Sequence, residues 1–197
     1  MKVFVEITRF AAQATWAQLR EYVTRLDDAG ATGVTVADHL FHTRDDLPRS
    51  EAVDVACDPL TTLASVAGMS GRLEVQTVVA NSAWIHPALL LRQFTQLAVL
   101  LGGERVTVGL GAGWSPEEFD ALGLELPPFR ARMDRLEEVL RFGRELYDTG
   151  RVSLAGRHVT ARDLPLGPVP ARPPALLVGG GSDRAAGPAR LRGDPPG

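Results

Sequence analysis

Cysteine, long apolar runs and an excess of positive charge are scarce or absent in this sequence of 197 residues. A single cysteine, Cys57, excludes an internal disulfide and a cysteine-rich metal site. No apolar run approaches the roughly 20 residues of a membrane span, and Glu6 and Arg9 interrupt the amino-terminal stretch, which is therefore not a signal peptide. The net charge of -3 gives no electrostatic case for a nucleic-acid or membrane partner. We expect a cytoplasmic globular protein without a metal.

What the sequence does contain is a composition suited to a packed core, with alternating strand and helix patterns. Hydrophobic residues make up 45% and charged residues 23%, which is typical of a folded domain. Short β-forming runs predict strands at 3–7, 33–37, 73–80, 105–110 and 175–178. Apolar spacings of three and four predict helices over 16–29, 59–68, 87–101 and 129–147, with Thr15 and Asp58 as caps and His86 as a helix-entry residue. We expect a long loop over 42–57 and an irregular stretch over 151–174 with a possible hairpin around Gly156.

Strands that alternate with helices predict an α/β protein with a parallel sheet, either a (β/α)8 barrel or a doubly wound open sheet. Periodicity alone does not separate these two architectures. Polar and glycine-rich residues follow the second, fourth and fifth strands, and barrel enzymes gather their chemistry at the carboxyl ends of strands. The first strand is followed by Thr8-Arg9-Phe10-Ala11, without the glycines of a dinucleotide-binding turn. These motifs favour the barrel.

An ordered set of segments resembles the luciferase-like monooxygenase superfamily. The set consists of Asp38-His39, Asp58 to Ala64, His86-Pro87 to Leu97, Gly102 to Trp114, Glu117-Glu118-Phe119 with Leu122-Gly123, and Pro173 to Ser182. No single segment is specific, but the order and spacing over residues 1–183 are. The resemblance implies a (β/α)8 barrel, an oxidoreductase or monooxygenase activity on a small-molecule substrate, and reduced FMN or coenzyme F420 bound at the carboxyl end of the strands.

His39 occupies the position where members of this family place an active-site histidine, at the end of the second strand. An imidazole titrates near neutral pH and can act as a general acid or base. Asp38 is expected at the cofactor site and could hold the imidazole tautomer, although adjacent strand residues point to opposite faces. The alternative for His39 is a solvated or capping histidine in a loop.

The resemblance also implies cofactor contacts after the third and fourth strands. Val78 and Val79 lie where F420-binding relatives form a bulge with a cis non-proline peptide behind the ring; an ordinary buried strand is the alternative. The turn Gly111, Ala112, Gly113 and Trp114 lets the backbone approach a ligand closely. Some F420-dependent sugar-phosphate dehydrogenases have a glutamate where this chain has Trp114, which weakens a sugar-phosphate reading. Trp114 is either a pocket wall or a simple packing residue.

The turn after the fifth strand, Gly180, Gly181 and Ser182, matches the family turn that contacts the cofactor phosphate. Backbone N–H groups at the start of a helix favour an anion, and a serine hydroxyl adds a donor. The alternative is a plain turn after a strand.

The length of the chain is the main departure from the family pattern. A (β/α)8 barrel usually needs about 250 residues, so residues 1–182 are expected to form a partial barrel of about five βα units. Residues 183–197, rich in Gly, Pro and Arg, are expected to be an aberrant or disordered tail. A truncated barrel leaves open strand edges, and we expect a homodimer. The alternative function is an inactive remnant, or a non-catalytic partner subunit of an intact homologue.

Overall fold

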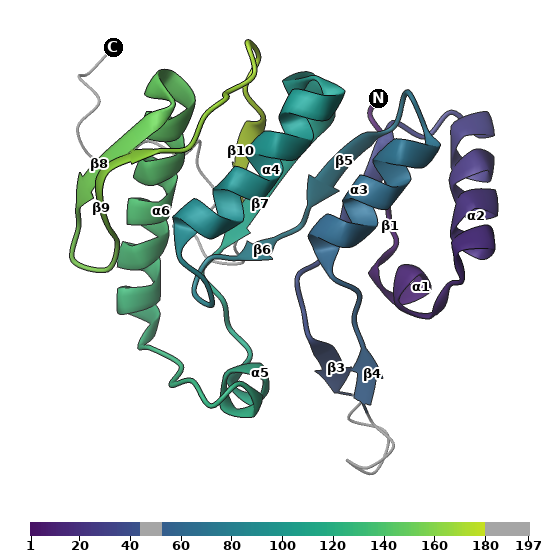
Figure 1. The fold of residues 1–197 in the computed structure, drawn as a ribbon. Coiled ribbons are helices and arrows are strands. Elements are labelled where there is room, and N and C mark those ends of the chain that lie inside the picture. The colour runs from purple at the N-terminus through teal and green to yellow at the C-terminus, as the bar shows by residue number, and fades with distance from the viewer. Residues whose placement is uncertain (44–52, 180–197) are drawn as a thin grey trace.

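The computed structural model describes residues 1–43 and 53–179, which form a parallel sheet covered by helices (Figure 1). The strands of the sheet lie in the order β1 (Phe4–Glu6), β2 (Gly33–Val36), β5 (Glu74–Thr77), β7 (Val106–Gly111) and β10 (Ala175–Val178), and β6 (Ala80–Asn81) pairs with β7. Every pairing in this sheet is parallel. The predicted parallel sheet is confirmed.

The strand order decides between the two architectures that the sequence leaves open. Strands lie side by side in the order in which the chain makes them, whereas a doubly wound sheet reverses its order near the first strand. Among the described residues, β1 and β10 each have a single strand neighbour, so they are the two edges of the sheet. The sheet is therefore an open segment of a barrel.

Four helices form one layer against the sheet, each beside the next in chain order (Figure 1). They are α2 (Trp16–Asp28), α3 (Pro59–Met69), α4 (Pro87–Leu101) and α6 (Phe129–Thr149). Thr15 begins α2 with a capping box shared with Gln18, and Asp58 accepts the Thr61 N–H at the start of α3. His86 accepts the Ala88 N–H and begins α4, as its predicted role requires. These side chains supply acceptors for N–H groups that have no partner inside the helix.

The core lies between this helical layer and the sheet. Val34, Val75 and Val108 in the strands have no exposed surface, and Leu91 and Phe94 of α4 are at most 1% exposed. Burying a side chain of this size stabilises the fold by roughly 1.5–3 kcal/mol. Strand β5 alternates, with Val75 and Thr77 buried and Glu74 and Gln76 only partly buried, as successive side chains of a strand point to opposite faces of the sheet.

Three details of the fold differ from the sequence-based expectations. Two short helices, α1 (Thr8–Gln13) and α5 (Pro116–Ala121), were not predicted. The expected long loop over 42–57 is wrong at its two ends, where β3 (Phe41–Thr43) and β4 (Val53–Val55) pair as an antiparallel ribbon. The predicted strand 73–80 is also not continuous.

That strand divides into β5 and β6 at Val78 and Val79, which are joined by a cis peptide bond. The bulge that the resemblance implies is therefore present, and the alternative of an ordinary continuous strand is wrong. After the break, Ala80 and Asn81 pair with Leu110 and Gly111 of β7.

The hairpin expected around Gly156 is confirmed as β8 (Arg151–Ala155) and β9 (Thr160–Pro165), which pair antiparallel. Glu138 of α6 accepts the backbone N–H groups of Arg157, His158 and Val159 at 2.7–2.8 Å. Burial raises the pKa of Glu138, but these three hydrogen bonds together outweigh that effect and lower it. They also attach the hairpin to α6. A short 3-10 helix, η1 (Gly103–Arg105), links α4 to β7.

Three sequence-based predictions fall outside the described residues. They are the turn of Gly180, Gly181 and Ser182, the domain boundary between 182 and 183, and the tail over 183–197. Among the helices that are described, none combines the length and the apolar character needed to cross a bilayer.

Candidate active site

A pocket of about 490 Å³ opens at the carboxyl end of the sheet, where α5 and the ribbon of β3 and β4 also lie (Figure 1). Its walls come from the segments that follow β2, β5, β7 and β10, and from the first turns of α6. The lining residues are Asp38, His39, Val78, Val79, Asn81, Gly111, Ala112, Gly113, Trp114, Glu118, Phe129, Arg132, Met133 and Gly179.

All the predicted site residues that the structure describes lie in this one pocket. They are Asp38, His39, Val78, Val79, Gly111, Ala112, Gly113 and Trp114, although they are spread over three strand ends. The pocket also contains six residues that sequence reasoning did not select: Asn81, Glu118, Phe129, Arg132, Met133 and Gly179. That these residues bind a cofactor stays a prediction.

His39 is paired with Glu118, which is 79 residues away in the sequence. The His39 Nδ1 atom lies 3.2 Å from Oε1 and 3.1 Å from Oε2 of Glu118. The Leu40 N–H donates to the same carboxylate at 2.6 Å. The Trp114 ring meets the imidazole edge to face, with ring centres 5.7 Å apart. The imidazole is therefore held by a carboxylate and an aromatic ring from the segment after β7.

Asp38 does not hold the imidazole, because its side chain is directed to β6. Its Oδ2 atom accepts the Asn81 N–H at 2.8 Å. Burial raises the pKa of Asp38 to about 6, and the nearby carboxylates Asp58 and Glu118 act in the same direction, against the Asn81 hydrogen bond and His39. Asp38 and His39 thus reach different neighbours, as adjacent residues of an extended chain do.

Asn81 places a side-chain amide in the wall of the pocket. It is 7% exposed, and its Oδ1 atom accepts the Ala83 N–H at 3.0 Å. With the oxygen engaged in this way, the NH₂ group is the part of the amide left to donate toward a ligand. Gly113 lies so close to Asn81 that an added Cβ would come within 2.6 Å of the Asn81 Oδ1 atom, and its φ is 75°. Only glycine therefore suits this position.

The Val79 side chain fills a space that three glycines leave open. A Cβ added to Gly111 or to Gly179 would come within 2.4 Å of a Val79 methyl group, and one added to Gly109 would lie 3.2 Å from it. Gly109 also exchanges hydrogen bonds of 2.9 Å with the Thr77 hydroxyl. The glycine-rich run of β7 therefore accommodates the bulge at Val79, in addition to forming the pocket wall.

The mouth of the pocket is apolar and aromatic, with one cation. Trp114 is 67% exposed and Val78 is 44% exposed, although large apolar side chains are usually covered. The Arg132 guanidinium donates to the Gly113 carbonyl and, at 2.9 Å, to the Pro127 carbonyl, and it lies 5.7 Å from the centre of the Phe129 ring. A flat apolar molecule with polar edges suits these walls.

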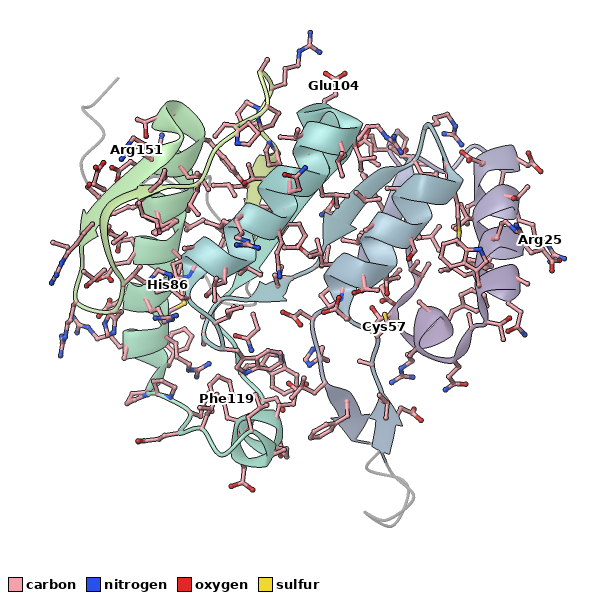
Figure 2. All side chains as sticks on the ribbon, viewed as in Figure 1. Arg25, Cys57, His86, Glu104, Phe119 and Arg151 are labelled. Atoms are coloured by element: carbon pink, nitrogen blue, oxygen red, sulfur yellow. The ribbon has the colours of Figure 1, made fainter. Side chains whose placement is uncertain are left out.

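The position of Glu118 depends on the docking of α5, a helix that begins at the Ser115 cap. Phe119, labelled in Figure 2, is 2% exposed and lies on α5 next to Glu118. Its ring centre is 6.2 Å from that of Trp84. The sequence does carry a signal for this helix, because Ser115-Pro116-Glu117-Glu118 has the cap and proline of a helix start. Nothing in the sequence tells which acid of the Glu117-Glu118 pair is buried.

A partial parallel barrel with a pocket at its carboxyl end, where a histidine is paired with a buried carboxylate, defines the class of protein. The chain belongs to the luciferase-like monooxygenase family, whose model matches residues 2–195.

Curated relatives include two kinds of enzyme. Over 165 residues the chain is 29% identical to an F420-dependent glucose-6-phosphate dehydrogenase of Amycolatopsis mediterranei (strain U-32), a match that covers 83% of this chain and 47% of the relative. Over 137 residues it is 29% identical to the pyrimidine monooxygenase RutA of Cronobacter sakazakii (strain ATCC BAA-894), covering 68% of this chain and 40% of the relative. The chain spans about half the length of the relatives it matches, or less.

Solved structures with the same fold include an F420-dependent secondary alcohol dehydrogenase in complex with an F420-acetone adduct. That structure aligns with a TM-score of 0.74 at 21% identity, covering 91% of this chain and 53% of the other. A riboflavin lyase with modified FMN aligns with a TM-score of 0.77 at 14% identity, covering 93% of this chain and 50% of the other. At these identities the likeness establishes the fold, which is an incomplete barrel of the luciferase-like type.

Proposed function

We propose that the pocket at the carboxyl end binds the tricyclic ring of FMN or coenzyme F420, and that the protein is an oxidoreductase or monooxygenase acting on a small-molecule substrate. The observation that carries the proposal is the pocket itself, in which the partly buried His39 and its buried partner Glu118 lie beside an exposed Trp114, and in which Gly111 and Gly113 form a wall without side chains. The family and its FMN- and F420-dependent members support it.

The residues of the pocket fit such a ring. The apolar side chains Val78, Trp114 and Met133 offer surfaces for its faces, and the Asn81 amide offers a donor for its carbonyl edge. We further propose that Gly180, Gly181 and Ser182, which lie outside the described residues, contact the cofactor phosphate. When bound, the reduced ring supplies hydride transfer or O₂ activation. His39 takes up or releases a proton.

Binding of the ring is tested by titrating the purified chain with FMN and, separately, with F420, followed by absorbance and fluorescence. We expect saturable binding of one of the two. Replacing Trp114→Ala removes a large apolar surface and should weaken binding by about tenfold, which corresponds to ~1.4 kcal/mol. Trp16→Ala is the matched control, because Trp16 is 60% exposed on α2 and is not a pocket residue. Equal losses in both variants would contradict a ring site at Trp114.

A second candidate is the alternative that the sequence analysis left open. In this case the chain is a non-catalytic partner that packs against an intact homologue, or an inactive remnant. The same titrations distinguish this function, because the isolated chain would then bind neither cofactor. The proposed homodimer and cytoplasmic location rest on the sequence analysis; sedimentation of the purified chain tests the first.

A further inference from the structure

Glu118 is a buried carboxylate whose partners are two donors from one short segment. It is 2% exposed, and in the described part of the chain no lysine or arginine pairs with it. Its hydrogen bonds go to His39 Nδ1 and to the Leu40 N–H, both directly after β2. Burying a carboxylate is costly unless hydrogen bonds compensate for the lost water. Glu118 therefore needs these two donors.

The chemistry of the pair fixes the position of one proton. Backbone N–H donors such as that of Leu40 favour the ionised form of a carboxyl group. An ionised carboxylate only accepts hydrogen bonds, so the Nδ1 atom that faces it carries a hydrogen. This holds for the neutral imidazole and for the imidazolium. The proton that comes and goes is then the one on Nε2.

We infer that Glu118 is a positioning residue, which keeps a proton on Nδ1 of His39, fixes the direction of the ring, and so confines the acid–base chemistry of His39 to Nε2. The inference extends the proposed function, because it names the atom through which His39 works. Asp38 does not supply this control, since its carboxylate bonds to the Asn81 N–H. Trp114 contacts the imidazole from a second side.

The tautomer of His39 is measured directly by long-range ¹H–¹⁵N correlation spectra of the chain labelled at histidine. The chain has 4 histidines, and His39→Gln assigns the signal of interest. Above the pKa of the imidazole, we expect the Nδ1–H form to exceed the Nε2–H form by about tenfold, as a hydrogen bond to a charged group allows. A wild-type spectrum dominated by the Nε2–H form would overturn the inference.

Variants then separate positioning from a general effect on folding. Glu118→Gln has one acceptor oxygen, for which the Leu40 N–H and Nδ1 compete, so the excess of the Nδ1–H form should fall several-fold. Glu118→Asp keeps a carboxylate and should therefore retain part of the excess of the Nδ1–H form. Glu117→Gln, an exposed neighbour on α5, should leave the spectrum unchanged. An unchanged tautomer in Glu118→Gln contradicts the inference.

The wild-type spectrum decides the question even if Glu118→Gln does not fold. The experiment uses neither cofactor nor substrate, so its failure does not affect the proposed function. Conversely, a chain that binds no cofactor can still show the Nδ1–H tautomer.

Discussion

The two ends of the sheet differ in the acidic side chains that they bury and in the apolar surface that they leave uncovered. At the amino end, arginines close the loops that enter the strands: Arg72 donates to the Ala31 carbonyl at 2.7 Å, and Arg105 donates to the Ser70 carbonyl at 2.7 Å. At the carboxyl end, the buried polar groups include the carboxylate of Glu118 and the amide of Asn81, and Trp114 is 67% exposed. Arginines satisfy backbone carbonyls at both ends, and the carboxyl end adds a buried carboxylate and uncovered apolar surface around a pocket.

The difference indicates which end stabilises the fold and which end is shaped for a ligand. Barrel enzymes carry their chemistry at the carboxyl ends of strands and their stabilising contacts at the other end. Substitutions at the amino end should therefore lower the free energy of unfolding and leave ligand binding by the folded chain unchanged. Substitutions at the carboxyl end should affect binding and pH dependence.

The largest expected effect is at the amino end. Leu73 precedes β5 and has no exposed surface, so Leu73→Ala should lower the free energy of unfolding by about 2–5 kcal/mol, through lost burial and a cavity. Urea denaturation measures this loss. Cofactor affinity of the folded fraction should not change; a large change in affinity would break the division between the two ends.

A smaller effect is expected where the carboxyl end is itself packed tightly. Gly111→Ala places a methyl group against Val79 and should cost roughly 1–3 kcal/mol of stability, as overpacking does. Val79→Ala removes the obstacle, so the double variant should be less destabilised than the sum of the single variants. Additive losses in this cycle would show that the two side chains do not compete for the same space.

The acid at the end of β2 should give the protein a pH-dependent stability. Burial raises the pKa of Asp38 to about 6, above its ordinary 3.8, so between these values the folded state holds more protons than the unfolded chain. The contribution of Asp38 to stability is then highest below about pH 4 and falls as the pH rises to about 6. Asp38→Asn should remove this slope and raise stability at neutral pH by on the order of 1 kcal/mol.

The control for this pH dependence is Asp28→Asn, at an exposed position at the end of α2. It should retain the slope of the wild type between the same pH values. If Asp38→Asn melts with the same pH profile as the wild type, the buried carboxyl is not its source.

The smallest effect is expected at the surface of the amino end. The Lys2 Nζ atom lies 2.8 Å from Glu74 Oε1, but the lysine side chain is 69% exposed. Lys2→Met should therefore change the free energy of unfolding by less than ~1 kcal/mol, and the difference should shrink at high salt. A larger loss of unfolding free energy, measured by thermal melts, would mean that exposed ion pairs contribute to stability at this end and that buried contacts are not its main source.

The sequence predicts the fold more fully than the site. Strands and long helices follow from apolar periodicity and caps such as Thr15 and Asp58, and the residues just after strands, including His39 and Trp114, reach the same pocket because parallel strands end at one edge. The short helices α1 and α5 do not follow from apolar periodicity, because each has only six residues and such a short helix shows little of the pattern.

The partner of His39 could not be predicted from local pattern. Asp38 is its neighbour in the chain, yet Glu118 is the contact, because the docking of α5 through Phe119 and Trp84 brings a distant carboxylate beside β2. Likewise, Asn81 enters the pocket because the strand breaks at Val78 and Val79 and resumes as β6. Such tertiary contacts leave no periodic signal in the sequence.

Hydrogen–deuterium exchange of the chain with and without FMN or F420 tests the central claim, that the carboxyl end holds the ring, most directly. Bound cofactor should slow exchange in the segments 36–40, 78–83 and 111–119, which form the pocket walls, and should leave the loops around Arg72 and Arg105 unchanged. Protection centred on those amino-end loops, or no protection in the pocket segments at saturating cofactor, would contradict the account.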